Sequence, residues 1–237
     1  MFTKAVHQAP CNECPTRQLC LAQGLDAEGL TELSSCVDAS APLGRGDYLY
    51  RAGDGAVSSY VVRSGVFKTI IVTPTGEEYV TGFHYPGELI GISALATGCH
   101  TDTAVALDTS TACRVHLEEL PTLWGHGSGL SLLRLIGEIE QAAQRDHINL
   151  SQGKADARVA GFLMSLSRRM HRLGRDPDVL YTPMSRTDLA SHLGMTLESL
   201  SRVLSRFAKA GFIRASRREI DLVELETLET LAGHLPE

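Results

Sequence analysis

The chain has 237 residues, 43% of them hydrophobic, and a formal net charge of −6. This composition supplies enough apolar material for one large domain or two modest ones, and apolar runs as short as Tyr60–Val62 exclude a membrane-spanning helix. The N-terminus contains no apolar signal region, and we therefore expect a cytoplasmic protein with no membrane partner.

Three cysteines near the N-terminus form the first candidate site. Cys11, Cys14 and Cys20 have the spacing C-x2-C-x5-C, which is neither the pair-plus-pair of a zinc ribbon nor the C-x2-C-x2-C run of a bacterial ferredoxin. One further thiolate would complete a four-ligand metal site. In a reducing compartment, six cysteines favour metal binding, redox sensing or burial over a disulfide framework. The alternative is a set of ordinary free thiols on a flexible terminus.

The sequence from about Leu43 to Val115 has a pattern typical of antiparallel strands. Short apolar or alternating runs occupy Tyr48–Tyr50, Ser59–Val62, Lys68–Val72 and Glu78–Thr81. The glycines expected to form turns between the runs are Gly44, Gly46, Gly53, Gly55, Gly65, Gly76, Gly82, Gly87 and Gly91. Short runs separated by regularly placed glycines predict antiparallel strands rolled into a small barrel.

A long helix is predicted from Leu130 to Leu150, which contains no proline and one glycine. Spacings of 4, 3, 4, 3 and 4 relate six of its residues in a heptad-like seam, namely Leu132, Ile136, Ile139, Ala143, Asp146 and Leu150. Such a seam either packs against its own domain or pairs with a second copy. Because polar residues are abundant between the seam positions, we favour pairing and expect a homodimer.

The C-terminal third contains a helix-turn-helix pattern. A helical segment over about 156–173 is followed by a loop, and Ser185 with Asp188 then forms a capping-box start for the next helix. Gly194 ends that helix, and Thr196 caps another that runs to about Lys209. Only three residues separate these two helices, which predicts a helix-turn-helix.

The outward face of the last helix determines what this module binds. Helical spacing places five polar residues opposite the buried leucines, and these are Glu198, Ser201, Arg202, Ser205 and Arg206. A carboxylate can accept from cytosine, a guanidinium can donate twice to guanine, and a serine hydroxyl can serve a base or a phosphate. The alternative is a surface ion pair between Glu198 and Arg202 with no role in binding.

A hairpin over 213–222 follows, which makes the module winged, and its tip arginines Arg217 and Arg218 are expected on phosphates. The charge distribution agrees with double-stranded DNA as the partner. Residues 154–219 contain 13 Lys+Arg and 6 Asp+Glu, a net charge of +7. The rest of the chain contains 9 Lys+Arg and 22 Asp+Glu, a net charge of −13. A basic binding module is thus joined to an acidic regulatory one.

Taken together, these motifs resemble the CRP–FNR family of bacterial transcription regulators and, within it, the FNR-type oxygen sensors with an iron–sulfur centre. The resemblance covers nearly the whole chain. It is carried by C-N-E-C-P-T-R-Q-L-C, Y-L-Y-R-A-G-D, R-S-G-V-F-K-T, T-G-F-H-Y-P-G-E-L-I-G, T-S-T-A-C-R-V and T-L-E-S-L-S-R-V-L-S-R-F.

The resemblance implies an α+β fold made of four parts. A cysteine segment (1–25) precedes a double-stranded β-roll sensor domain of the cyclic-nucleotide-binding type (26–125), a dimerisation helix (126–153) and a winged helix-turn-helix domain (154–237). It implies that a [4Fe–4S] cluster is bound by Cys11, Cys14, Cys20 and Cys113. A fourth thiolate on a β-roll strand would also tie the N-terminal loop to the domain, and cluster loss would then shift a monomer–dimer balance.

Further expectations concern DNA. Glu198, Ser201 and Arg202 would read half-sites of a TTGAT-N4-ATCAA-like palindrome, and the regulator would act with RNA polymerase. Cys36 and Cys99 match no ligand position and are expected to be small buried or incidental thiols. The sequence contains no P-loop, nucleophile elbow or histidine-rich motif, so we expect no enzyme activity.

Several alternatives stay open from the sequence. The same cysteines could bind zinc or no metal, and the protein could respond to another small effector. A cyclic-nucleotide sensor is disfavoured because Gly87-Glu88-Leu89 is not followed by the arginine that cradles the phosphate, and Asp102 lies nearby. Haem binding through His84 or His116 has little support. At the helix seam, where the family has an acidic residue, one register places Ala143 and the heptad count places Asp146.

Overall fold

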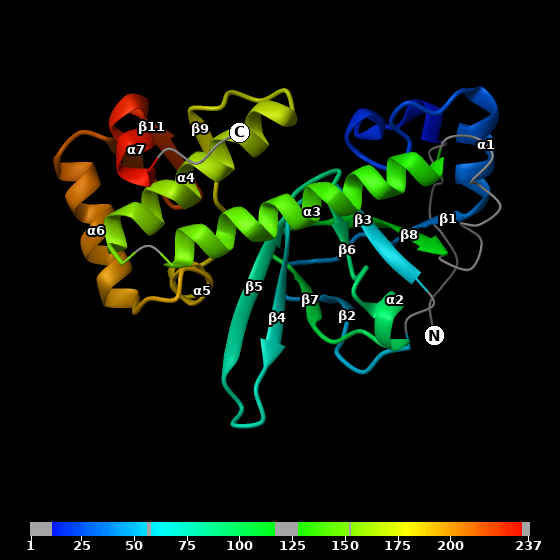
Figure 1. Cartoon of the computed structure of the whole chain (residues 1–237), viewed down its shortest axis with the longest axis horizontal. Coiled ribbons are helices and arrows are strands. Elements are labelled where there is room, and N and C mark those ends of the chain that lie inside the picture. Colours follow the sequence, from blue (N-terminus) through cyan, green and yellow to red (C-terminus); the bar gives the residue numbers. More distant parts are fainter. Residues whose placement is uncertain (1–10, 56–57, 117–127, 152, 234–237) are drawn as a thin grey trace. The chain divides into compact units, whose positions relative to one another are not determined.

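The computed structural model describes residues 11–55, 58–116, 128–151 and 153–233. Two compact units are present, Met1–Ile139 and Glu140–Glu237, and the boundary between them falls inside helix α3 (Ser128–Ser151) (Figure 1). Among the described residues, no helix combines the length and the apolar character needed to cross a bilayer.

The first unit opens with two short 3₁₀ turns, η1 (Cys11–Glu13) and η2 (Arg17–Leu19), followed by helix α1 (Ala27–Ser35). The carboxylate of Asp26 caps α1 by accepting a hydrogen bond from the backbone N–H of Gly29 at 2.8 Å. The sequence did not predict α1.

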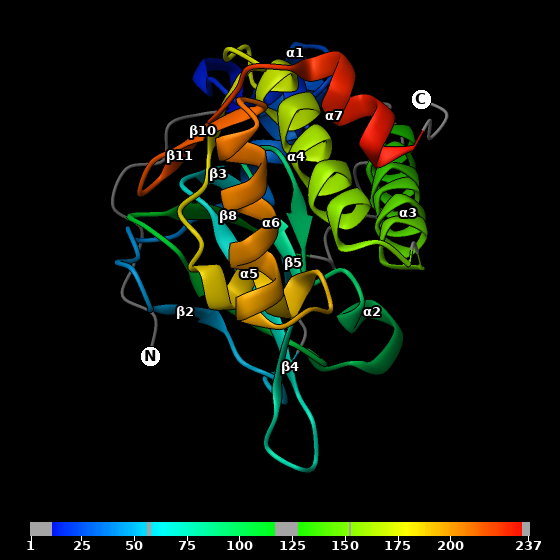
Figure 2. The same cartoon turned by 90° about the vertical axis from the view of Figure 1, so that its left-hand side faces the viewer.

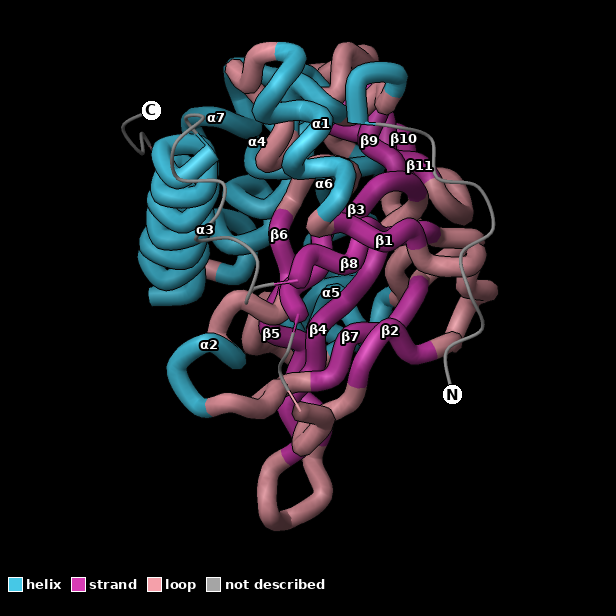
Figure 3. Tube along the Cα trace, turned by 90° about the vertical axis from the view of Figure 1, so that its right-hand side faces the viewer, coloured by secondary structure: helices cyan, strands magenta, loops and turns pink. Residues whose placement is uncertain are grey.

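Two four-stranded antiparallel sheets make up the body of the first unit. Their strands are among those coloured magenta in Figure 3. The first sheet has the order β1 (Val37–Ala39), β8 (Thr111–His116), β3 (Ser58–Ser64) and β6 (Leu89–Ile90). The second has the order β2 (Tyr48–Tyr50), β7 (Thr103–Ala106), β4 (Phe67–Val72) and β5 (Glu78–His84), and a short helix α2 (Ala94–Thr97) lies between β6 and β7 in the chain. The four strand runs predicted from the sequence are confirmed.

One of the predicted turn glycines is not in a turn. Gly82 lies inside β5, where it pairs with Thr69 beside a shift in register. A Cβ atom at this position would come within 3.1 Å of the His84 ring, so the glycine leaves room for that side chain.

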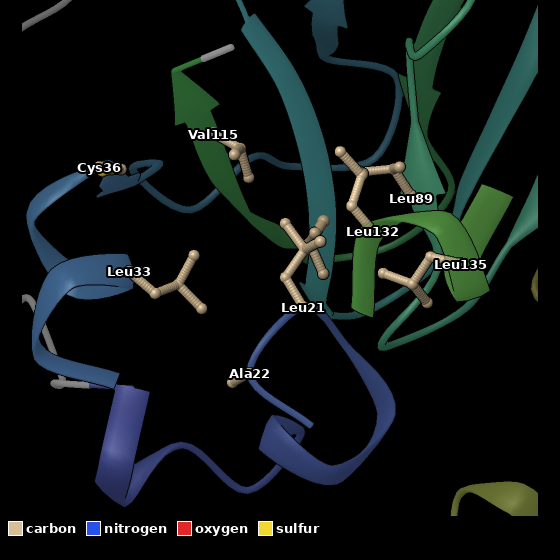
Figure 4. Packing of buried hydrophobic residues seen from close by; sticks show 9 residues of the cluster. Leu21, Ala22, Leu33, Cys36, Leu89, Val115, Leu132 and Leu135 are labelled. Atoms are coloured by element: carbon tan, nitrogen blue, oxygen red, sulfur yellow. The ribbon is translucent and has the colours of Figure 1, made fainter. Parts of the chain in front are cut away.

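Two hydrophobic clusters stabilise the first unit. One fills the space between the sheets and includes Leu49, Val62 and Phe67. We call the other the junction cluster; its buried members are Leu21, Ala22, Leu33, Cys36, Val61, Leu89, Val115, Leu132 and Leu135. Figure 4 shows that it joins the cysteine segment, α1, the first sheet and the beginning of α3.

The second unit contains the helix-turn-helix. After α4 (Ala155–Arg172), its elements are β9 (Val179–Tyr181), α5 (Arg186–His192), α6 (Leu197–Lys209), β10 (Ile213–Ala215), β11 (Glu219–Leu222) and α7 (Leu225–Ala232). Figure 2 shows α5 beside α6, and the strands form an antiparallel sheet in the order β10-β11-β9. Helix α7, which the sequence did not predict, packs against α4.

Capping explains why the two helices begin and end where they do. Ser185 and Asp188 form the expected capping box of α5, and Thr196 accepts from the Ser199 N–H at the start of α6. At the end of α5, Gly194 has a φ of +59°, and the Met195 N–H donates to the Ala190 carbonyl at 3.0 Å. These contacts hold the turn between the helices in one conformation.

Candidate cysteine site and nucleic-acid interface

The four cysteines of the predicted metal site come from two parts of the first unit. Cys11 begins η1, Cys14 follows that turn, Cys20 follows η2, and Cys113 lies in β8. All four are free thiols and half-buried. The backbone N–H of Cys11 donates to Ser34 Oγ at 3.3 Å, which attaches the start of the segment to α1.

Packing and electrostatics bring these cysteines into one neighbourhood. Cys11, Cys20 and Cys113 pack against the junction cluster. Burial raises the pKa of the Cys113 thiol to about 12, and the charges of Cys14, Cys11 and Cys20 act on it in the same direction. Burial likewise raises the pKa of Cys20 to about 11, with contributions from Cys14 and Cys11. Within the described ranges, no three His, Cys, Asp or Glu side chains are arranged to hold a metal ion.

Arginines of two different elements, β3 and α3, act on this neighbourhood. The charge of Arg63 in β3 lowers the pKa of Cys113, and that of Arg134 in α3 lowers the pKa of Cys20, although burial outweighs both. Sequence reasoning missed these two residues, because only the fold brings them near the cysteines.

The two remaining cysteines differ from the four. Cys36 is buried in the junction cluster with 3% of its surface exposed. Cys99 is half-buried, and its backbone forms an isolated antiparallel β-bridge with Gly55. Neither is among the groups that shift the pKa of Cys20 or Cys113.

A group of aromatic and acidic side chains, Tyr50, His100 and Asp102, lies in the β-roll. The Tyr50 and His100 rings stack with centroids 3.9 Å apart, and the Tyr50 hydroxyl donates to Asp102 Oδ1 at 3.2 Å. Burial lowers the pKa of His100, which is 2% exposed and whose Nδ1 has no hydrogen-bond partner. Burial raises the pKa of Asp102. A carboxylate at this place would repel the phosphate of a cyclic nucleotide, which agrees with the expectation that the protein is not a cyclic-nucleotide sensor.

All the residues predicted to contact DNA are exposed in the second unit. On α6 these are Glu198, Ser201, Arg202, Ser205 and Arg206, and between β10 and β11 they are Arg217 and Arg218. The opposite face of α6 is buried through Leu200, Val203, Leu204 and Phe207. The helix therefore presents one polar face and holds its position through the other.

Two ion pairs organise that polar face. Arg202 Nη2 donates to Glu198 Oε1 at 2.5 Å, and both side chains are more than 70% exposed. Arg206 pairs with Asp156 at the beginning of α4. Arg158, also on α4, donates to the Leu193 and Gly194 carbonyls at 3.3 and 3.1 Å and so fixes the turn in front of α6.

Exposure divides the predicted dimer seam of α3 into two faces. Leu132 is 8% exposed in the junction cluster and Ile139 is half-buried against it, whereas Ile136, Ala143 and Leu150 are exposed and Asp146 is half-buried. One exposed stripe with helical spacing runs along α3, and it consists of Leu133, Ile136, Glu140, Ala143, His147 and Leu150. We call this the α3 stripe. Further exposed residues, Glu138, Gln141, Gln144 and Ile148, lie outside it.

Comparison with known families and proteins agrees with this geometry. Residues 42–124 match the model of the cyclic nucleotide-binding domain, and residues 157–231 match that of the Crp-like helix-turn-helix domain.

Known relatives match nearly the full length of the chain. The chain is 35% identical over 232 residues to the fumarate and nitrate reduction regulatory protein of Escherichia coli K12, which covers 97% of this chain and 92% of the relative. It is 36% identical to the transcriptional activator protein anr of Pseudomonas aeruginosa, covering 97% and 95%. Among solved structures, FixK2 from Bradyrhizobium japonicum is similar in fold, with a TM-score of 0.74, 24% identity and coverage of 84% and 99%.

Proposed function

The chain belongs to the CRP–FNR family of DNA-binding transcription regulators, and on that premise we propose that it senses oxygen through a [4Fe–4S] cluster. The expected β-roll and helix-turn-helix architecture and the role of a regulator rather than an enzyme are confirmed by this membership. Such a protein would act in the cytoplasm, where promoter DNA is found. The observation that carries the proposal is the gathering of Cys11, Cys14, Cys20 and Cys113 in one half-buried neighbourhood.

The chemistry of these residues fits such a cluster. Cysteine thiolates are the usual ligands of iron–sulfur clusters, and a set of four satisfies a [4Fe–4S] centre. When bound, the cluster would supply an iron–sulfur core whose integrity depends on oxygen. Three ligands belong to the N-terminal loop and the fourth to β8, so binding would tie the loop to the first sheet.

The junction cluster offers a physical route from the cysteines to α3. Leu21 and Ala22 follow Cys20 directly in the chain, and they are buried in the same cluster as Leu132 and Leu135 of α3 (Figure 4). A change in the loop therefore changes what the beginning of α3 packs against. We propose that loading orders this packing and favours association of two copies.

We place the dimer contact on the α3 stripe. Leu132 is buried in the chain's own first unit and Ile139 is half-buried against it, so the exposed positions of α3 are the better candidates for contact with a second copy. The stripe continues through Ile136, Ala143 and Leu150, which were part of the predicted seam, and adds Leu133, Glu140 and His147. Its spacing of 3, 4, 3, 4 and 3 is that of a coiled-coil seam.

The DNA contacts follow from the polar face of α6. We propose that Glu198, Ser201 and Arg202 read bases of a TTGAT-N4-ATCAA-like palindrome while Arg217 and Arg218 contact phosphates. A dimer would present two such helices about one helical turn of DNA apart, so affinity would depend on dimerisation. RNA polymerase is the partner we expect at the promoter.

Anaerobic purification followed by iron and sulfide analysis tests the proposal. We expect iron, sulfide and visible absorbance under argon, a dimer in sedimentation, and gel-shift binding to the palindrome that is weaker in air. Zinc thiolates do not absorb visible light, so a colourless zinc protein would identify a structural brace instead. An iron-free protein that binds DNA equally in air and argon would contradict oxygen sensing.

A further inference from the structure

Arg134, on the first turns of α3, has a side chain that is 35% exposed and pairs with Glu138, yet two of its donor atoms make no hydrogen bond. Its Nε and Nη2 atoms are inaccessible to solvent and make no hydrogen bond. The carboxylate of Glu138 lies one turn further along the helix, and its Oε1 is 3.6 Å from Nε. Leaving donors of a charged group buried and unsatisfied costs about 1–3 kcal/mol or more. An acceptor in another state of the protein would remove this cost.

The surroundings of Arg134 indicate which group could accept these hydrogen bonds. The next residue, Leu135, is 3% exposed in the junction cluster, against which Cys11, Cys20 and Cys113 also pack. The positive charge of Arg134 acts on Cys20. Metal binding converts thiols into thiolates, which accept hydrogen bonds from cations. The loaded site would therefore place negative sulfur near donors that make no hydrogen bond in the cluster-free chain.

We propose that Arg134 is a positioning residue that donates hydrogen bonds to the sulfur of the loaded cysteine site and so connects this site to the dimerisation helix. This inference rests on the proposed [4Fe–4S] site. It goes further in assigning a residue outside the cysteine motifs to cluster retention. It also gives the site a second link to α3, because Arg134 lies in the same helix as the α3 stripe.

Arginine suits this task better than lysine. Its planar guanidinium holds a delocalised charge with several donors in a fixed arrangement, whereas a lysine ammonium is a compact and strongly hydrated point charge. Hydrogen bonds from neighbouring groups to metal ligands and cluster sulfurs set cluster stability and potential. Arg63, whose charge acts on Cys113, stands on the β3 side of the same neighbourhood.

Four proteins purified under argon test the inference: wild type, Arg134→Gln, Arg134→Lys and the matched control Arg145→Gln. Arg145 lies in the same helix and is not among the charges that act on Cys20 or Cys113. Each loaded protein is challenged with an iron chelator, and remaining iron and sulfide are measured with the sedimentation mass. We expect R134Q to retain iron roughly ten- to a hundredfold less well, R134K to be intermediate and R145Q to match wild type. The R134Q dimer should be lost with its iron.

A merely structural arginine would give a different result. Cluster-free R134Q should be about as stable to unfolding as cluster-free wild type, because the substitution removes the unsatisfied guanidinium donors and, with them, only an i,i+4 ion pair with Glu138 worth about 0.2–0.5 kcal/mol. Lower stability of cluster-free R134Q, or iron retention equal to wild type, would overturn the inference. Arg134→Met, which keeps the aliphatic stem, gives the same prediction if R134Q folds poorly. Failure of wild type itself to bind iron would refute the proposed function rather than the role of Arg134.

Discussion

At the residue scale, one glycine sets how closely the cysteine loop approaches the β-roll. Gly87, in the turn between β5 and β6, has a φ of +91°, and a Cβ atom there would lie 2.6 Å from Leu19 Cβ and 2.8 Å from the Leu19 carbonyl oxygen. Leu19 directly precedes Cys20. The loop can therefore reach its observed position only because residue 87 has no side chain.

We predict that Gly87→Ala destabilises the protein and also impairs iron binding. The alanine strains the backbone and pushes Leu19 away, for a total of about 1–3 kcal/mol. Gly76→Ala is the matched control, since Gly76 has a φ of +85° but a Cβ atom there would meet no other atom within 4 Å. It should cost about 1 kcal/mol and leave iron content unchanged. Chemical denaturation and iron analysis of both variants measure the two effects, and equal iron contents would contradict the prediction.

The second prediction at this scale concerns pH and His100. Because burial lowers the pKa of the folded imidazole, the unfolded chain binds the proton more readily. The stability contributed by His100 is therefore present above its unfolded pKa, about 6.5, and is lost as the pH falls through the folded pKa. The raised pKa of Asp102 has the opposite sign, with stability lost as the pH rises through the folded value.

His100→Phe isolates the histidine contribution. Phenylalanine can keep the stack on Tyr50 and removes the unpaired Nδ1. We expect the free energy of unfolding of wild type to fall more steeply than that of H100F between about pH 6.5 and pH 5. Denaturation curves across this range provide the measurement, and parallel pH profiles would show that His100 does not titrate with folding.

At the scale of elements, α4 controls part of the DNA-reading helix. Asp156 holds Arg206 in an ion pair, so this arginine is not free to contact a phosphate in the structure described. We predict that Asp156→Asn releases Arg206 and removes a nearby negative charge. DNA affinity should rise, and the salt dependence of binding should steepen by about one phosphate contact.

The control for this prediction removes the same charge elsewhere in the second unit. Glu226 is exposed on α7, and Glu226→Gln should leave the salt slope unchanged. Titrations of the palindrome at several salt concentrations compare D156N, E226Q and wild type. A wild-type slope for D156N would mean that Arg206 does not reach the DNA backbone.

The elements also show what the sequence could and could not predict. Helices α5 and α6 follow closely from Ser185, Gly194 and Thr196, because capping residues fix helix ends locally. Helix α1 was missed because its nine residues include Gly29 and several serines and threonines, and its burial depends on the junction cluster. For α3 the extent was predicted, but periodicity alone cannot say which of two neighbouring stripes the chain's own core takes.

The candidate site divides in a similar way. The loop cysteines were predicted from local spacing, whereas Cys113 was identified through the family resemblance, supported by the need for a fourth thiolate, since it lies far away in the sequence. Arg134 and Gly87 were not predicted as parts of the site. Their contribution depends on contacts between segments that only the folded chain brings together. Local pattern thus predicts ligands better than it predicts the residues that support them.

At the scale of the whole molecule, the α3 stripe determines how two copies would meet. In a symmetric parallel pair, each seam residue lies near the same residue of the second copy. Ala143 belongs to the stripe, whereas Asp146 lies outside it and is half-buried on the neighbouring face with Asn149, which is 4% exposed. The acidic residue in the stripe is Glu140, which accepts a hydrogen bond from Gln144 at 3.1 Å. Two Glu140 carboxylates would therefore repel each other across the proposed dimer.

The last prediction follows from this repulsion. We expect Glu140→Ala to strengthen dimerisation of the cluster-free protein roughly tenfold, because a pair of like charges at an interface is costly and each alanine removes one of them. Asp146→Ala, which removes the same charge from the neighbouring face outside the stripe, serves as the control and should not strengthen it. Sedimentation of both variants and wild type over a concentration series, at low and high salt, gives the dissociation constants. Salt should reduce the difference between wild type and E140A, since screening weakens the repulsion. A stronger dimer for D146A and not for E140A would place the contact between copies on the neighbouring face of α3 that includes Asp146.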